Sequence, residues 1–299
     1  MKNLLYSLIL ELTANNATTL PIGTGHQTHA LLLNIITQVD PALAARLHDE
    51  PGYRPFTVSS LRGPTERGNS LLLQPGQLCR LRVTLLDGGP LWQALSTCFL
   101  EGRLTTVTLG TAELTLRRLL STPTVDPTGW SASTDWQTLA TTPASNHISI
   151  RFASPTAFSL GDHRFALFPE ASLVWDSLMR SWNLYAPEVL RVDKEALRAF
   201  VAKQILISDY HLNTTTLHFP KYSQKGFLGT CTYHIKAEDS YAPQVAALAE
   251  FARYSGIGYK TTMGMGQVRR EIGSIQAEET VDAHSSTVEV ISGTSGSIH

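Results

Sequence analysis

The order in which strand-like and helix-like patterns follow one another constrains this fold most. In the first half, strand patterns are expected at 4–12, 56–63, 79–86 and 105–120. Helical apolar stripes are expected at 26–39 and 89–102, with a short extra helix at 41–50 because Asp40 before Pro41 is a good helix start. The first half therefore runs strand, helix, strand, strand, helix, strand.

The second half repeats this order. Strands are expected at 147–158, 205–219, 226–237 and 264–271, and helices at 168–185, 192–203 and 242–256. A sheet covered by two helices, formed twice, predicts the α+β class with tandem ferredoxin-like (RRM-like) domains and a C-terminal glycine-rich loop. The helices are too long and too regular for a β-sandwich.

A segment rich in Thr, Ser and Pro separates the two halves at 121–146 and has no periodicity. We expect an N-terminal domain at 1–125, a linker at 126–146 and a C-terminal domain at 147–272. Residues 273–299 are polar and acidic, and we expect them to be a disordered tail.

Composition excludes several protein classes. The three cysteines are far apart and form no CxxC pair, so neither a zinc site nor a disulfide framework is expected. Glu11 interrupts the apolar run near the N-terminus, and no apolar run reaches the roughly 18 residues of a membrane helix. We therefore expect a cytoplasmic protein with no cofactor, no metal and no membrane contact.

Charge is unevenly distributed along the chain. The net charge is −1, but residues 271–299 hold five acidic residues and no Lys or Arg. The remaining body carries about four more basic than acidic residues. Such a body is compatible with an RNA ligand without being diagnostic of one.

The stretch "GIGYKTTMGMGQVR" (256–269) is glycine-rich and follows the last expected helix. It is neither a Walker A loop nor a dinucleotide fingerprint, because Lys260 lies mid-loop and a strand follows. We expect Gly256 to cap the helix in a left-handed conformation, Gly258 to turn the chain, and the last two glycines to allow a close backbone approach. Exposed amides beside Lys260 could then bind phosphates, although a loop that only packs two domains together remains an alternative.

The spacing Gly-x-Gly, five residues, Gly-x-Gly after a terminal helix resembles the RAMP superfamily of CRISPR-associated proteins. Within it, "DPALAARLHDEPGYRPFTVSSL" (40–61), "LPIGTGHQTHALLL" (20–33) and "KGFLGTCTYHI" (225–235) resemble the repeat-processing CRISPR endoribonucleases. The resemblance implies a metal-independent endoribonuclease that cleaves CRISPR repeat RNA in the precursor transcript. Its products would carry 2′,3′-cyclic phosphate and 5′-hydroxyl ends. The alternative is a non-catalytic RNA-binding subunit of a CRISPR effector complex.

The resemblance also implies catalytic residues. His48 matches the position of a catalytic histidine, Arg54 that of an assisting cation, and His29 a second histidine position used by some members. His26 is a further candidate that could cap the first helix or contact RNA. Histidine suits acid–base work because its pKa lies near neutral pH. Leu33 stands where some members carry a tyrosine, so any third catalytic group must differ, with Ser59 and Ser60 as weaker candidates.

Cations and the glycine loop supply the expected RNA contacts. The RNA-binding candidates are Arg62, Arg67, Lys225, Arg253, Gly256, Gly258, Lys260, Gly264, Gly266 and Arg269. Two tyrosines, Tyr222 and Tyr259, are candidates for base stacking. The expected partners are CRISPR repeat RNA and the backbone subunits of a CRISPR effector complex, and both a monomer and a homodimer are compatible with the sequence.

Overall fold

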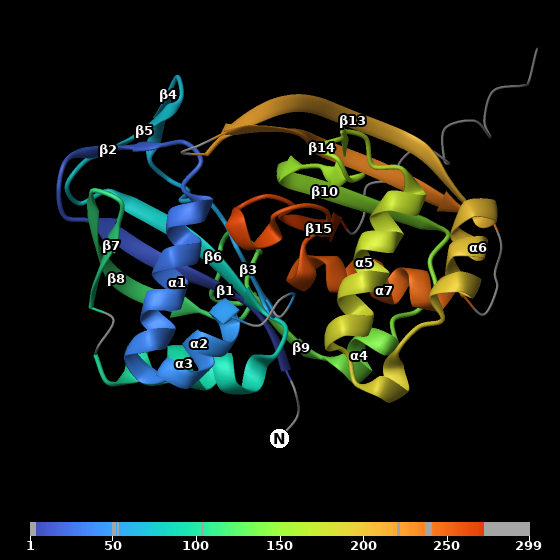
Figure 1. Cartoon of the computed structure of the whole chain (residues 1–299), viewed down its shortest axis with the longest axis horizontal. Helices are drawn as coiled ribbons and strands as arrows, with labels where there is room; N and C mark the ends of the chain where they lie inside the picture. Colours follow the sequence, from blue (N-terminus) through green and yellow to red (C-terminus); the bar gives the residue numbers. More distant parts are fainter. Residues whose placement is uncertain are drawn as a thin grey trace, which may run out of the picture.

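The computed structural model describes residues 4–49, 52, 54–102, 105–219, 222–236 and 241–271. Two α+β units lie side by side in Figure 1, the N-terminal one in blue to cyan-green and the C-terminal one in light green to red. The expected tail at 273–299 lies outside the described residues.

The N-terminal unit is built on an antiparallel sheet whose strands differ in length. Its elements are β1 (Leu4–Ala14), α1 (Gly25–Val39), α2 (Pro41–Asp49), β3 (Phe56–Val58), β6 (Leu78–Leu85), α3 (Gly88–Leu100), β7 (Thr106–Leu109) and β8 (Ala112–Leu120). The strand order is β3-β6-β1-β8, continued by β7. Counted along the chain, β1 is the first and β6 the third of the four core strands, and both lie in the centre, as in a ferredoxin-like sheet. Leucines of β1 and β6 pack against α1 and α3 to form the core of this unit.

The C-terminal unit repeats the arrangement. Its elements are β10 (His147–Thr156), β11 (Phe158–Ser159), β12 (Phe165–Ala166), α5 (Ala171–Tyr185), η1 (Glu188–Leu190), α6 (Lys194–Gln204), β13 (Ile205–His218), β14 (Ser223–Ile235), α7 (Ala242–Ser255), η2 (Thr261–Met263) and β15 (Val268–Glu271). The strand order β13-β14-β10-β15 is again ferredoxin-like. The tandem ferredoxin-like prediction is confirmed.

A third sheet was not predicted. It consists of β2 (Thr18–Pro21), β5 (Ser70–Leu73) and β4 (Thr65–Arg67) in that order. The expected strand at 56–63 ends at Val58, and the strand β4 and its turn to β5 follow within residues 65–70. Strands of three or four residues are too short to show a period of two, which is why the pattern missed them.

The segment expected to be a linker, 126–146, contains regular structure. Its strand β9 (Ala132–Asp135) pairs with the start of β1, and its helix α4 (Trp136–Ala140) packs into the core of the C-terminal unit. The side chain of Asp135 caps α4 by accepting a hydrogen bond from the Thr138 amide. The two units are therefore joined through a shared strand pairing and a shared core as well as through the chain itself.

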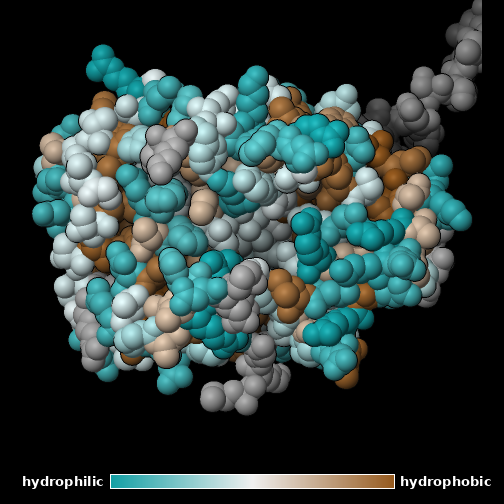
Figure 2. Space-filling model, in the orientation of Figure 1, coloured by the Kyte–Doolittle hydropathy of each residue, from teal (hydrophilic) through white to brown (hydrophobic). Residues whose placement is uncertain are grey.

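The surface is predominantly polar on the face shown in Figure 2, where brown areas are separated by hydrophilic side chains. Across the described ranges, no helix combines the length and apolar character that a membrane crossing requires.

Candidate active site and nucleic-acid interface

The candidate catalytic histidines come from the two N-terminal helices. His26 and His29 lie one turn apart on α1, and His48 lies at the end of α2. The α2 helix begins where the sequence predicts, because the Asp40 carboxylate accepts a hydrogen bond from the Leu43 amide at 2.9 Å. His26 is exposed, and it does not cap α1: Thr24 is the N-cap residue, and its hydroxyl accepts a hydrogen bond from the Leu61 amide instead.

His29 is partly buried, whereas His26 and His48 are exposed. The Nδ1 atom of His29 lies 3.0 Å from the carbonyl oxygen of Thr262, and its ring packs beside Phe56. Burial lowers the pKa of His29, and the nearby charges of Arg54 and of the other two histidines lower it further, although the bond to Thr262 opposes this. His29 is therefore a neutral imidazole near pH 7, as a proton acceptor must be.

His48 has a different environment. Its side chain is 78% exposed, and its Nδ1 lies 2.8 Å from the Asp49 carboxylate. Arg54 donates from Nη2 to the His48 carbonyl oxygen at 2.9 Å, and the Arg54 amide donates to the Tyr185 hydroxyl on α5 at 3.0 Å. Arg54 therefore links the end of α2 to the C-terminal unit, and the expected catalytic residues gather at the junction of the two units.

The glycine-rich loop connects α7 to β15 and lies between the units, in orange-red in Figure 1. All four glycines have positive φ, from 64° to 90°. Gly256 ends α7 as expected, but its ψ of −178° is extended rather than left-handed helical. The sequence therefore predicted the positive φ correctly and the ψ incorrectly.

The expectation that the loop exposes its amides is wrong for three of the four glycines. The Gly256 amide donates to the Ala252 carbonyl, the Gly258 amide to the Ser177 hydroxyl at 2.9 Å, and the Gly266 amide to the Pro155 carbonyl at 3.0 Å. Those amides satisfy the buried backbone of the C-terminal unit and cannot also bind phosphate.

Lys260 is a half-buried cation within this loop. Its Nζ lies 4.1 Å from the ring centre of Tyr222, 4.8 Å from that of Phe219 and 5.2 Å from that of Tyr259. Burial lowers the pKa of Lys260. The two tyrosines proposed for base stacking therefore contact the ammonium group of Lys260, as cation–π partners, in this structure.

A cleft of about 700 Å³ opens between the two sheets, on the faces that their helices leave uncovered. Side chains of both units line it. Its basic lining residues are Arg62, Arg80, Arg82, Arg151, Arg269 and His211. Among the described residues that line the cleft, none is Asp or Glu. The cleft is therefore a concave surface with a positively charged lining.

Two of the expected RNA-binding arginines, Arg62 and Arg269, line this cleft. Arg253 does not: its Nη1 donates to the Gly129 carbonyl at 2.9 Å, which ties α7 to the segment between the units. Arg67 and Lys225 are exposed on β4 and β14, outside the lining of the cleft.

The sequence pattern missed three cleft arginines, Arg80, Arg82 and Arg151. Alternation along 79–86 did place Arg80 and Arg82 on one strand face opposite Leu81, Val83 and Leu85. A charged face on a central strand was the available signal, because such a face needs either water or a second surface above it.

Arg82 is buried between the units. Its Nε donates to the Ser7 hydroxyl at 2.9 Å, and its other nitrogens donate to the Gln267 side chain and the Arg253 carbonyl. Burial lowers the pKa of Arg82 to about 9, which leaves the guanidinium charged at neutral pH. Arg82 therefore contributes both to the unit–unit contact and to the positive potential of the cleft.

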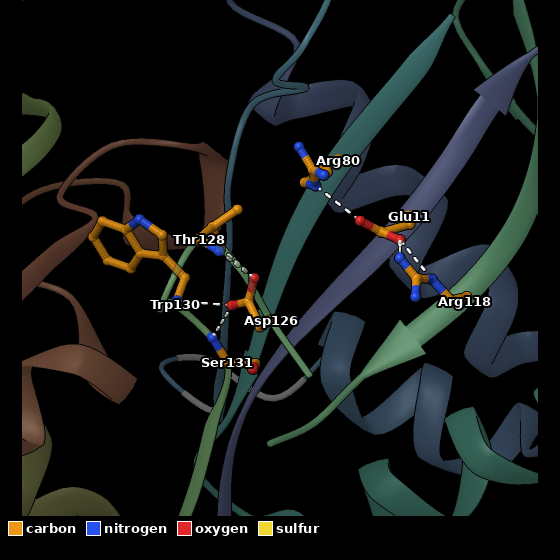
Figure 3. Close-up of polar contacts among 7 residues, drawn as sticks. All are labelled: Glu11, Arg80, Arg118, Asp126, Thr128, Trp130 and Ser131. Atoms are coloured by element: carbon orange, nitrogen blue, oxygen red, sulfur yellow. Dashed lines mark hydrogen bonds and ion pairs between the residues drawn. The ribbon is translucent and has the colours of Figure 1, made fainter. Parts of the chain in front are cut away.

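Glu11 holds two arginines of the N-terminal sheet (Figure 3). Its buried carboxylate accepts hydrogen bonds from Arg80 at 3.0 Å and from Arg118 at 2.8 Å. Burial alone would raise the pKa of Glu11, but the hydrogen bonds and charges of the two arginines outweigh burial and lower it. The ionised carboxylate therefore holds the Arg80 side chain on the sheet face that forms the cleft wall.

The second cluster in Figure 3 is a turn organised by Asp126. Its buried carboxylate accepts from the backbone amides of Thr128, Trp130 and Ser131 at 2.6–2.8 Å. The Trp130 indole points away from the carboxylate, and the guanidinium carbons of Arg82 and Arg269 lie 4.8 and 5.0 Å from its ring centre. The turn thus places an aromatic ring among the cleft arginines.

No group of three or more His, Cys, Asp or Glu side chains in the described part of the chain is arranged to hold a metal ion.

Two family models match the chain. The model described as the CRISPR Cas6 N-terminal domain matches residues 4–141, and the model described as CRISPR-associated endoribonuclease Cas6 matches residues 150–268. The Streptococcus thermophilus endoribonuclease Cas6 is 26% identical over 125 residues, or 42% of this chain and 51% of that protein. The Mycobacterium tuberculosis Cas6 is 28% identical over 131 residues, or 42% of this chain and 40% of that protein. The chain thus spans about half the length of the curated relatives it matches, or less.

Solved structures match over a larger share of the chain. A Thermus thermophilus Cas6 in a product complex has a TM-score of 0.73 and 27% identity, covering 89% of this chain and 100% of that one. A second Cas6 product complex has a TM-score of 0.71 and 25% identity, covering 90% and 100%. Because the two family models occupy both halves and the solved structures share the whole fold, this chain belongs to the Cas6 family of CRISPR-associated endoribonucleases.

Proposed function

We propose that this protein is a metal-independent endoribonuclease that binds the repeat RNA of a CRISPR precursor transcript and cuts it within each repeat. The observation that carries the proposal is the gathering of His26, His29, His48 and Arg54 at one junction, beside the glycine-rich loop. Family membership and the product complexes of two solved Cas6 relatives support it.

The proposed reaction is attack of a ribose 2′-hydroxyl on its own 3′-phosphodiester. It requires a base for the 2′-hydroxyl, an acid for the leaving 5′-oxygen and a cation for the charge on the phosphorane. His29 is a neutral imidazole and suits the base. His48, whose ring is oriented by Asp49, suits the acid in its imidazolium form. Arg54, whose charge lowers the pKa of His29, would supply the cation that stabilises the phosphorane.

RNA binding is proposed to use the arginine-lined cleft between the sheets. Phosphate contacts from Arg151 and Arg269, on adjacent strands, would give affinity that falls as salt rises. The Trp130 ring offers a stacking surface for an unpaired base. Lys260, together with the exposed hairpin cation Lys225, would extend the contacts beyond the cleft.

Cleavage of labelled repeat RNA in EDTA tests the proposal. The wild type is expected to cut, and the product ends should be a 2′,3′-cyclic phosphate and a 5′-hydroxyl. His29→Ala and His48→Ala should each slow single-turnover cleavage at least about 100-fold, the usual contribution of one acid–base group. His163→Ala, in the exposed turn between β11 and β12, is the matched control and should cut normally.

Binding without cleavage on every repeat tested would contradict the enzymatic proposal and favour a non-catalytic RNA-binding subunit. Cleavage that EDTA abolishes would contradict the metal-independent mechanism. Salt-insensitive or absent RNA binding would contradict both the endoribonuclease and the RNA-binding-subunit hypotheses. The glycine-rich loop would then serve only to pack the two units together.

A further inference from the structure

The ring of His29 is hydrogen-bonded to the glycine-rich loop, although the two residues are 233 positions apart in sequence. Its Nδ1 lies 3.0 Å from the Thr262 carbonyl oxygen. A carbonyl oxygen accepts hydrogen bonds and cannot donate them, so Nδ1 must carry the proton. In the neutral ring the lone pair is then on Nε2.

The Thr262 carbonyl is held by the local structure of the loop. It lies in η2, which the Lys260 carbonyl closes by accepting from the amides of Met263 at 2.9 Å and Met265 at 3.3 Å. Lys260 has φ 56° and ψ 41°, a left-handed conformation that a lysine adopts only where its surroundings hold it. The rings of Phe219 and Tyr222, at the end of the β13–β14 hairpin, hold it through its ammonium group.

The loop also contacts the start of α1 without any intervening side chain. A Cβ on Gly25 would lie 2.0 Å from the Met263 carbonyl oxygen and 2.7 Å from the Gly264 amide nitrogen. A Cβ on Gly264 would lie 3.0 Å from the Gly25 Cα. Backbone contact between Gly25 and residues 263–264 therefore sets the distance from the Thr262 carbonyl to the His29 ring, one turn further along α1.

We infer that the glycine-rich loop is the positioning device for His29, because its Thr262 carbonyl fixes the tautomer in which Nε2 accepts the 2′-hydroxyl proton. This inference rests on the proposed function. In the step, the 2′-oxygen loses its proton to Nε2 and bonds to phosphorus, the bond from phosphorus to the 5′-oxygen breaks, and the 5′-oxygen takes a proton from His48. The backbone of the loop therefore acts through His29 rather than through amide contacts to phosphate.

The tautomer is measurable without RNA. In protein with ¹⁵N-labelled histidine, long-range ¹H–¹⁵N correlation spectra distinguish a protonated ring nitrogen from one with a lone pair. The His29 signals are assigned by their loss in His29→Gln. At a pH where His29 is neutral, Nδ1 should be protonated and Nε2 should carry the lone pair. Protonation at Nε2 instead would overturn the inference.

Gly25→Ala tests the coupling, because its Cβ cannot fit against the Met263 carbonyl. The matched control is Gly89→Ala, which also adds a Cβ near the start of a helix but meets no atom within 4 Å. Gly25→Ala should lose the fixed Nδ1–H tautomer and slow single-turnover cleavage at least tenfold, with repeat RNA affinity within threefold of wild type. Gly89→Ala should leave the tautomer, the cleavage rate and the RNA affinity unchanged. A Gly25→Ala protein that loses the tautomer but cuts within twofold of wild type would refute the positioning role.

Lys260→Met provides a second variant if Gly25→Ala does not fold. It keeps a straight side chain between the rings and removes the ammonium group, and its readout is the His29 tautomer alone, so any contact of Lys260 with RNA does not enter. We expect the spectrum to show both neutral tautomers of His29. A spectrum identical to that of wild type would show that the Lys260 ammonium group does not help to position His29. If wild type shows the expected tautomer yet cuts no repeat RNA, the proposed function fails while the tautomer assignment stands.

Discussion

Replacing Glu11 with Gln tests how the cleft keeps Arg80 in place. The carboxylate is 2% exposed and accepts from Arg80 and Arg118, whose side chains are 32% and 62% exposed. Gln keeps the size of the side chain and one acceptor oxygen, but it removes the charge. The guanidinium groups then lose their ionic partner while keeping most of their contact with water.

The expected loss of stability follows from these exposures. A hydrogen bond to a charged group contributes about 1.5–3 kcal/mol, and two are weakened here. Solvent screening of the two arginines reduces the effect, and the variant no longer buries a charge. We expect a net loss of about 2 kcal/mol in the free energy of unfolding, or about thirtyfold in the folding equilibrium.

The pH dependence identifies the cause. Because the folded-state pKa of Glu11 lies below its ordinary value of 4.5, its contribution is fully present above about that pH and is lost as pH falls through the lowered folded-state pKa. Urea unfolding of wild type and Glu11→Gln at neutral pH and at increasingly acidic pH measures this difference. The gap of about 2 kcal/mol should hold down to about pH 4.5 and close at lower pH.

Glu113→Gln is the matched control, an exposed carboxylate on β8 of the same sheet. It should change the free energy of unfolding by less than about 0.5 kcal/mol. An equal loss in both variants, or a Glu11→Gln loss that does not change with pH, would show that the ion pair is not its origin.

Three further predictions concern the cleft and the histidines. Asp126→Asn should lower the free energy of unfolding by about 1–2 kcal/mol and weaken repeat RNA binding, because one of the two oxygens that accept from the backbone amides of the Trp130 turn becomes an NH₂ group. An unchanged unfolding curve would refute this. Arg151→Ala should reduce the salt slope of RNA affinity by about one, whereas Arg164→Ala, on an exposed turn outside the cleft, should leave it unchanged. The acidic limb of single-turnover cleavage should lie below pH 6.5, because burial lowers the pKa of His29 and keeps it able to accept a proton at lower pH; a limb at or above 6.5 would remove His29 as the base.

Local patterns predicted much of the architecture. The apolar positions Leu31, Leu32, Ile35 and Ile36 recur at helical spacing and are the buried face of α1. The Asp40–Pro41 helix start and the positive φ of Gly256 also followed from the chemistry of single residues. These features depend on neighbours within a few positions, which is the range over which a sequence pattern carries structural information.

Local patterns failed where short strands or distant contacts decide the outcome. The sheet of β2, β5 and β4 has too few residues per strand to show periodicity. The loop amides seemed available for phosphate because nothing nearby in sequence indicates that Ser177 and Pro155 would accept their hydrogen bonds.

The sequence by itself determined the repeated order of strands and helices, the family resemblance and the histidines worth testing. Only the tertiary structure decided what these residues touch: Glu11 against Arg80 and Arg118, Trp130 among the cleft arginines, and His29 against Thr262. The physical reason is range. Periodicity encodes which face of an element is buried, whereas a cleft wall or an oriented imidazole depends on how two sheets from different halves of the chain pack against each other.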